Sequence, residues 1–125
     1  MKNKHPFSLK NRIFSFKYAF NGFKTLIKEE HNSRIHFTAT LCVCFLGFLF
    51  KINRFEWIAV LLSIALVVGM EALNSGIENL ADFYTSEKND LIKKAKDVSA
   101  FAVLFSVIIS AVVGLIVFIP YLLSY

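Results

Sequence analysis

Hydrophobic residues are gathered into three long stretches, and most polar residues lie before or between them. The stretches cover about residues 35–52, 55–70 and 98–123. A helix needs about 20 mostly apolar residues to cross a bilayer. With their polar ends included, the predicted transmembrane helices cover about residues 30–52, 55–84 and 97–123. The pattern therefore predicts an all-α integral membrane protein, folded as a single domain over residues 1–125.

A different pattern precedes the first stretch. Between residues 9 and 28, apolar side chains recur every three or four positions, and the basic residues lie largely off this stripe. This spacing predicts an amphipathic helix that lies on the membrane surface. A soluble helix packed on a partner is the alternative. The apolar positions are Ile13, Phe16, Phe20, Phe23 and Ile27.

Composition and charge agree with a membrane protein. Hydrophobic residues make up 56% of the chain and charged residues 18%, against about 45–50% and 25% in soluble domains. Of the 14 basic residues, eight precede Ile35 and four lie between Lys88 and Lys96. Basic residues mark the cytoplasmic side of a membrane protein. We therefore expect a cytoplasmic N-terminus, three membrane crossings and no nucleic-acid partner.

The second stretch acquires a polar face where it meets the cytoplasmic side. Its polar residues fall at positions i, i+3, i+4, i+7, i+8 and i+11, which share one face of an α-helix. The helix is therefore expected to continue beyond Met70. Glu71 would lie about 24 Å along its axis, near the membrane boundary. The face consists of Glu71, Asn74, Ser75, Glu78, Asn79 and Asp82.

This polar face is suited to phosphoryl transfer. Clustered carboxylates bind Mg²⁺, and a carboxylate in an apolar setting can act as a general base. Lys93, Lys94 and Lys96, expected in the following loop, could bind phosphate. A small ion-coupled transporter is an alternative, because intramembrane acids also mark ion paths. A non-enzymatic membrane subunit is another, but it would leave the polar face unexplained.

The third stretch carries small residues at every fourth position. Such a seam lets helix backbones approach closely in lipid, either within the chain or between copies. Three helices alone are not expected to bury the charged groups from lipid on every side, so we expect an active site shared between subunits. The seam consists of Ala102, Ser106, Ser110 and Gly114.

Three motifs resemble the prokaryotic diacylglycerol kinase family, which includes the undecaprenol kinases. They are E-A-L-N-S-G-I-E-N-L-A-D at 71–82, K-K-A-K-D at 93–97 and E-H-N-S-R-I-H at 30–36. The resemblance implies a homotrimeric, multi-pass lipid kinase of the bacterial inner (cytoplasmic) membrane. It would use ATP and Mg²⁺ to phosphorylate a lipid alcohol in phospholipid metabolism. Both undecaprenol and diacylglycerol stay open as substrates, although the 30–36 motif and F-E-W at 55–57 resemble the undecaprenol-kinase branch more.

The resemblance also implies roles for individual residues. Glu71 matches the general base, and Glu30 and Glu78 match the metal-bridging carboxylates. In many members a tyrosine–histidine pair follows the glutamate that matches Glu87, whereas this chain has Lys88 and Asn89. This departure from the family pattern falls on the side of the pocket that would hold the nucleotide base. His36 is expected to have a helix-packing or interfacial role, with a proton shuttle as the alternative. Substrate-positioning roles fall on Arg34 and Asn74, and nucleotide contacts on Tyr18, Glu30, Glu78, Glu87, Lys96 and Asp97.

Overall fold

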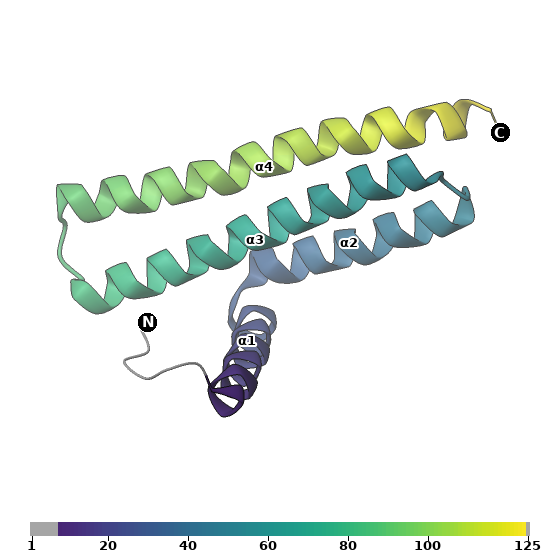
Figure 1. Cartoon of the computed structure of the whole chain (residues 1–125). Helices are drawn as coiled ribbons and strands as arrows, with labels where there is room; N and C mark the ends of the chain where they lie inside the picture. Colours follow the sequence, from purple (N-terminus) through teal and green to yellow (C-terminus); the bar gives the residue numbers. More distant parts are fainter. Residues whose placement is uncertain (1–7, 125) are drawn as a thin grey trace.

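The protein is built entirely of helices in the computed structural model, which describes residues 8–124. Three apolar helices lie side by side, with α3 between α2 and α4, and α1 leaves this layer at a steep angle (Figure 1). The all-α prediction is therefore confirmed. The helices are α1 at Leu9–Glu29, α2 at His31–Leu49, α3 at Arg54–Tyr84 and α4 at Asp90–Leu123.

The turn between α2 and α3 is fixed by side chains at the start of α3. Lys51 has a positive φ of 52°, which reverses the chain. Asn53 Oδ1 accepts a hydrogen bond from the Glu56 backbone N–H at 2.9 Å, and the Asn53 N–H donates to Glu56 Oε1 at 3.0 Å. This capping box satisfies two backbone donors that a helix start leaves unpaired. The Tyr121 hydroxyl also donates to Glu56 Oε1, so the end of α4 is tied to the start of α3.

The apolar core lies at the same end of the layer. Its centre is a cluster from the α2–α3 turn, α3 and α4, formed by Ile52, Val60, Val117 and Phe118. Gly47 lets Trp57 pack directly on α2, since a Cβ on this glycine would lie only 2.7 Å from the Trp57 ring. Part of the small-residue seam also packs within the chain, where Ser110 Oγ donates to the Ser63 carbonyl at 3.3 Å.

The turn between α3 and α4 is shorter than the sequence suggested. Asn89 caps α4, because its Oδ1 accepts hydrogen bonds from the backbone N–H groups of Leu91 and Ile92 at 2.9 and 3.2 Å. The helix therefore begins at Asp90, about two turns before the expected start near 97. The expectation of a loop that carries Lys93, Lys94 and Lys96 is wrong: these lysines lie on the first turns of α4.

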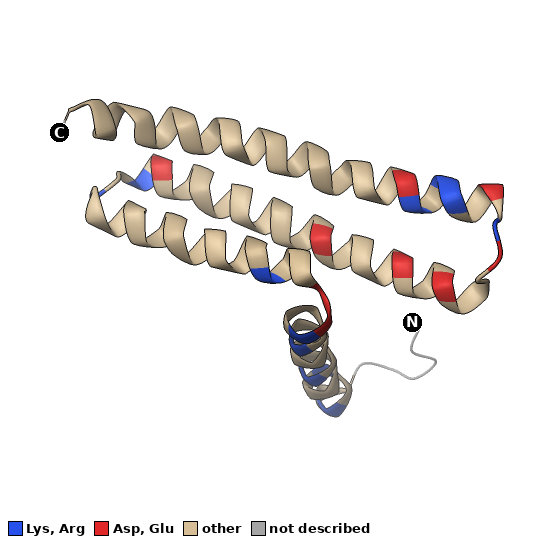
Figure 2. Ribbon diagram, turned by 180° about the vertical axis from the view of Figure 1, so that it is seen from behind, with Lys and Arg blue, Asp and Glu red and all other residues tan. Residues whose placement is uncertain are grey.

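Within residues 8–124, two helices, α3 and α4, are long and apolar enough to cross a membrane. Large apolar side chains stay exposed along both of them. Charged residues lie on α1 and toward the helix ends, apart from one acidic position near the middle of α3 (Figure 2). A contiguous apolar surface of this extent marks a membrane-facing or partner-facing region. The exposed residues include Leu61, Leu62, Leu66, Phe101, Leu104, Phe105 and Ile108.

Candidate active site

Glu71 lies at the centre of the candidate site. It is only 4% exposed although it is ionisable and follows the apolar part of α3. His36 on α2 faces it, with Nε2 3.6 Å from Glu71 Oε2. The charges of Glu30 and Glu78 also act on Glu71. The sequence argument that one chain cannot shield these acids from lipid is wrong for Glu71, because α2 and α3 of the same chain cover it.

Glu30 reaches this site from the junction of α1 and α2. Its backbone is extended, with φ −107° and ψ 108°, so the chain turns sharply between the two helices. Ser75 on α3 donates its hydroxyl proton to Glu30 Oε1 at 2.8 Å. Two acids 41 residues apart in the sequence, Glu30 and Glu71, are thereby brought to one region. Sequence reasoning gave Ser75 no role, although its place on the polar face of α3 was the available signal.

Glu78 lies two turns beyond Glu71 on the same face of α3 and is half-buried. A bound Mg²⁺ usually takes one or two protein carboxylates and completes its shell with waters and substrate phosphates. Glu30 and Glu78 fit this pattern, because both lie close enough to act on Glu71 and Ser75 orients Glu30. Within residues 8–124, no three His, Cys, Asp or Glu side chains are grouped to hold a metal by themselves.

Asn74 is fixed by the neighbouring helix. Ser99 on α4 donates its hydroxyl proton to Asn74 Oδ1 at 2.8 Å. This bond joins the polar face of α3 to α4 one turn after Lys96. The Ser99 Oγ also lies 3.0 Å from the Lys96 carbonyl oxygen, so the amide expected to position substrate contacts α4 beside Lys96.

Lys96 crosses from α4 to the polar face of α3. Its Nζ lies 2.6 Å from Asp82 Oδ1, and Glu78 also acts on it electrostatically. Asp97, by contrast, pairs with Lys93 on its own helix at 2.7 Å. Asp82 was not predicted as a site residue, although it is the last acid of the polar face.

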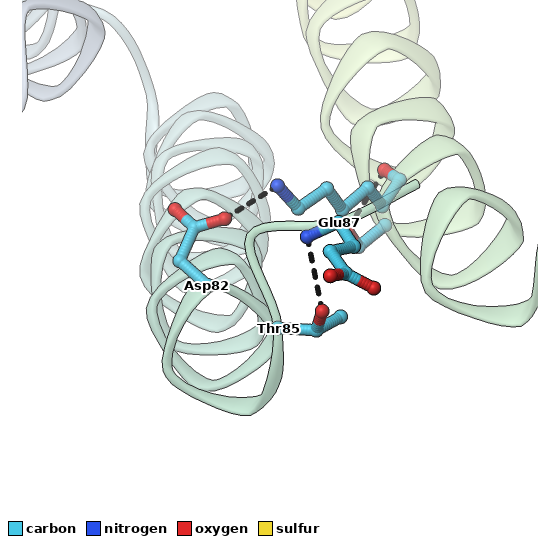
Figure 3. A network of polar contacts seen from close by, with 5 residues as sticks. Asp82, Thr85 and Glu87 are labelled. Atoms are coloured by element: carbon cyan, nitrogen blue, oxygen red, sulfur yellow. Dashed lines mark hydrogen bonds and ion pairs between the residues drawn. The ribbon is translucent and has the colours of Figure 1, made fainter. Parts of the chain in front are cut away.

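A groove of about 550 Å³ lies at this end of the layer, between the end of α3 and the start of α4. The hydroxyl of Thr85 accepts a hydrogen bond from the Glu87 backbone N–H at 3.0 Å and shapes the turn (Figure 3). Three of the expected nucleotide contacts, Glu87, Lys96 and Asp97, line this groove together with Lys88 and Asn89. The groove therefore combines lysines with carboxylates, as a site for a metal-bound polyphosphate requires.

The structure does not bring every expected residue to these carboxylates. Tyr18 lies on α1 and is 61% exposed, and Arg34 is exposed on the first turn of α2. Neither residue lines the groove at the α3–α4 turn. One chain thus groups Glu30 and Glu78 around Glu71, and places Lys96 beside Asp82 and Glu78.

Comparison with known proteins gives a consistent picture. The model of the family described as prokaryotic diacylglycerol kinase matches residues 17–118, which include every expected site residue. An undecaprenol kinase of Bacillus subtilis is 36% identical over 111 residues, covering 88% of this chain and 90% of that protein. A diacylglycerol kinase of Synechocystis is 31% identical over 115 residues, covering 91% and 66%. A diacylglycerol kinase of Haemophilus influenzae is 31% identical over 106 residues, covering 84% and 89%.

Proposed function

The chain belongs to the prokaryotic diacylglycerol kinase family and is a lipid kinase; we propose that it transfers the γ-phosphate of ATP to the hydroxyl of undecaprenol or diacylglycerol at the cytoplasmic membrane boundary. The observation that carries this proposal is the burial of Glu71 where the apolar part of α3 ends and its polar face begins, with Glu30 and Glu78 acting on it. A lipid hydroxyl and a nucleotide phosphate can meet only where apolar and charged surfaces adjoin, and this is such a place.

In the proposed reaction, Glu71 accepts the proton of the lipid hydroxyl. The freed oxygen forms a bond to the γ-phosphorus as the bond to the bridging oxygen breaks, and ADP leaves with that electron pair. Glu30 and Glu78 would hold Mg²⁺, which when bound neutralises charge on the phosphates. Ser75 keeps the Glu30 carboxylate oriented toward α3 throughout.

The nucleotide is proposed to bind beside this centre, in the groove at the α3–α4 turn. Lys96 would exchange Asp82 for a phosphate oxygen, because a lysine ammonium binds phosphate as a point charge. Glu87 and Asp97 line the same groove, and Tyr18 would contact the nucleotide from α1. Asn74, fixed by Ser99, would position substrate.

We further propose that α2, α3 and α4 all cross the bacterial inner membrane, with the N-terminus in the cytoplasm. The 19 residues of α2 span about 28 Å, close to the thickness of the hydrocarbon core. Its first turn is polar, which suits the cytoplasmic boundary. The helix α1 would lie on the membrane surface, since no residue in it is buried by the rest of the chain. Arg34 would then face the lipid substrate at that boundary.

A homotrimer with shared active sites completes the proposal. The separation of Tyr18 and Arg34 from the groove in one chain is the feature that favours contributions from a neighbouring copy. Exposed apolar side chains on α3 and α4 supply the area for helix packing between copies. The number three rests on the family resemblance. An ion-coupled transporter is less well supported, because the acids of the polar face run from Glu71, just past the middle of α3, to Asp82 near its C-terminal end, and no acid lies between Glu56 and Glu71.

Radiolabelled phosphate transfer from ATP in mixed micelles tests the function. Purified protein would be assayed with undecaprenol, with diacylglycerol and without a lipid alcohol. We expect label in one of the two lipids and little ATP consumption without lipid. ATP consumption that does not depend on lipid alcohol, or no transfer to either lipid, would contradict the proposal. The same assay assigns the substrate, which the relatives leave divided between undecaprenol and diacylglycerol.

A further inference from the structure

The face of α2 that lies against Glu71 carries two polar side chains that the proposed reaction does not use. Ser33 and His36 lie one turn apart on α2 and line the same narrow gap as Glu71. The other lining residues of this gap, Leu26, Phe37 and Val68, are apolar. Glu71 therefore meets α2 at a small polar patch inside an apolar contact.

Ser33 is unusual within this patch. It is 1% exposed, and its Oγ has no hydrogen-bond partner among the described residues. The gap beside it has no volume for a water molecule. A buried hydroxyl without a partner is costly, and each such group in a folded protein calls for an explanation. Among the residues that line the gap, Glu71 carries the carboxylate that could accept the Ser33 hydroxyl proton.

His36 provides the second donor. Its Nε2 is 3.6 Å from Glu71 Oε2, longer than a hydrogen bond. Contacts of this kind are often long without substrate and shorten when the reacting complex forms. A buried carboxylate keeps its charge only if donors compensate its lost hydration. Glu30 and Glu78 both repel that charge, whereas Ser33 and His36 of α2 are the donors that line the gap beside Glu71.

We propose that Ser33 and His36 are positioning residues that hold the Glu71 carboxylate for proton acceptance. The His36 Nε2–H and the Ser33 hydroxyl would donate hydrogen bonds to the side of the Glu71 carboxylate that faces α2. An oxygen lone pair on the other side of the carboxylate would stay free to accept the proton of the lipid hydroxyl. Neither residue loses a proton or touches substrate, so the proton and bond balance of the proposed phosphate transfer is unchanged. The inference rests on the proposed function and adds two residues to its site.

Two substitutions of His36 separate this role from simple packing. His36→Leu keeps an apolar side chain of similar size but removes the donor, whereas His36→Gln keeps an N–H donor. A hydrogen bond to a charged group is worth enough to lower kcat about 10- to 100-fold in His36→Leu, with KM for ATP unchanged. His36→Gln should recover most of this loss. His31→Leu, exposed five residues earlier on α2, is the matched control and should behave as wild type.

Ser33→Ala tests the proposal independently. The hydroxyl has no partner in the free protein, so its removal should leave the unfolding temperature unchanged or raise it, while kcat falls. Ser106→Ala is the matched control, because Ser106 is also 1% exposed but donates to the Val103 carbonyl on α4. It should lower stability slightly and leave kcat unchanged.

The outcomes distinguish this inference from the proposed function. Absence of lipid-dependent transfer by the wild type would contradict the proposed function itself. An active wild type with unchanged kcat in Ser33→Ala, or with equal loss in His36→Leu and His36→Gln, would overturn the positioning role alone. If the His36 variants do not fold, the rate of Ser33→Ala decides the question.

Discussion

Removal of the Ser75 hydroxyl should loosen the proposed metal site without removing any metal ligand. Ser75 Oγ donates to Glu30 Oε1 at 2.8 Å across the contact between the α1–α2 junction and α3. Glu30 is the extended cap residue between the end of α1 and the start of α2, and the bond from Ser75 is the contact that fixes its carboxylate against α3. In Ser75→Ala, the carboxylate is free to turn away from Glu78.

The size of the effect follows from the bond that is lost. A hydrogen bond to a charged group contributes about 1.5–3 kcal/mol, and loss of an outer-shell partner typically weakens metal binding about 10- to 100-fold. We therefore expect the Mg²⁺ concentration for half-maximal rate to rise about 10- to 100-fold. The rate at saturating Mg²⁺ should stay near wild type, because Glu30, Glu71 and Glu78 are all present.

Lipid phosphorylation measured across a Mg²⁺ titration provides the assay. Ser63→Ala, on the same helix but two turns before Glu71, is the matched control and should leave the titration unchanged. A folded Ser75→Ala protein with the wild-type Mg²⁺ dependence would refute the reasoning. A loss of rate that added Mg²⁺ does not restore would also refute it, because the defect would then lie outside the metal site.

Three further predictions concern the other groups of the site. Glu30→Gln and Glu78→Gln should each raise the Mg²⁺ requirement and lower the maximal rate, and an unchanged Mg²⁺ titration in both would count against their role. Lys96→Met should raise KM for ATP more than Lys93→Met, because Lys96 reaches across to α3 whereas Lys93 pairs within α4; equal KM values would contradict this. Mixed oligomers of Tyr18→Ala and Glu71→Gln chains should recover part of the activity if neighbouring copies share a site, whereas Glu30→Gln with Glu71→Gln should not, since one chain holds both acids together. No recovery in the first mixture, with mixing confirmed, would argue for a site within one chain.

The sequence predicted the elements whose signals are periodic. The apolar stripe from Ile13 to Ile27 predicted a helix at 9–28, and α1 covers Leu9–Glu29. The polar face from Glu71 to Asp82 predicted that the second apolar helix continues beyond Met70, and α3 ends at Tyr84. Both signals are local, because residues three or four apart share a helix face whatever the rest of the chain does.

The features that the sequence did not predict depend on single contacts or on distant residues. The start of α4 at Asp90 is fixed by the Asn89 cap, while the lysines that follow carry no apolar period. The bond from Ser75 to Glu30 joins residues 45 positions apart, and no spacing rule specifies such a contact. The place of His36 beside Glu71 likewise depends on how α2 packs against α3, so sequence alone favoured a packing role.

The central claim is that Glu71 is the base of a lipid kinase, and phosphate transfer by Glu71→Gln tests it most directly. The variant keeps the size of the side chain but cannot accept the hydroxyl proton, so the rate of labelled phosphate transfer to lipid should fall about 10²- to 10⁴-fold. Glu29→Gln, exposed on the last turn of α1, should transfer phosphate as wild type does. A folded Glu71→Gln oligomer that retains more than half of the wild-type rate would contradict the account.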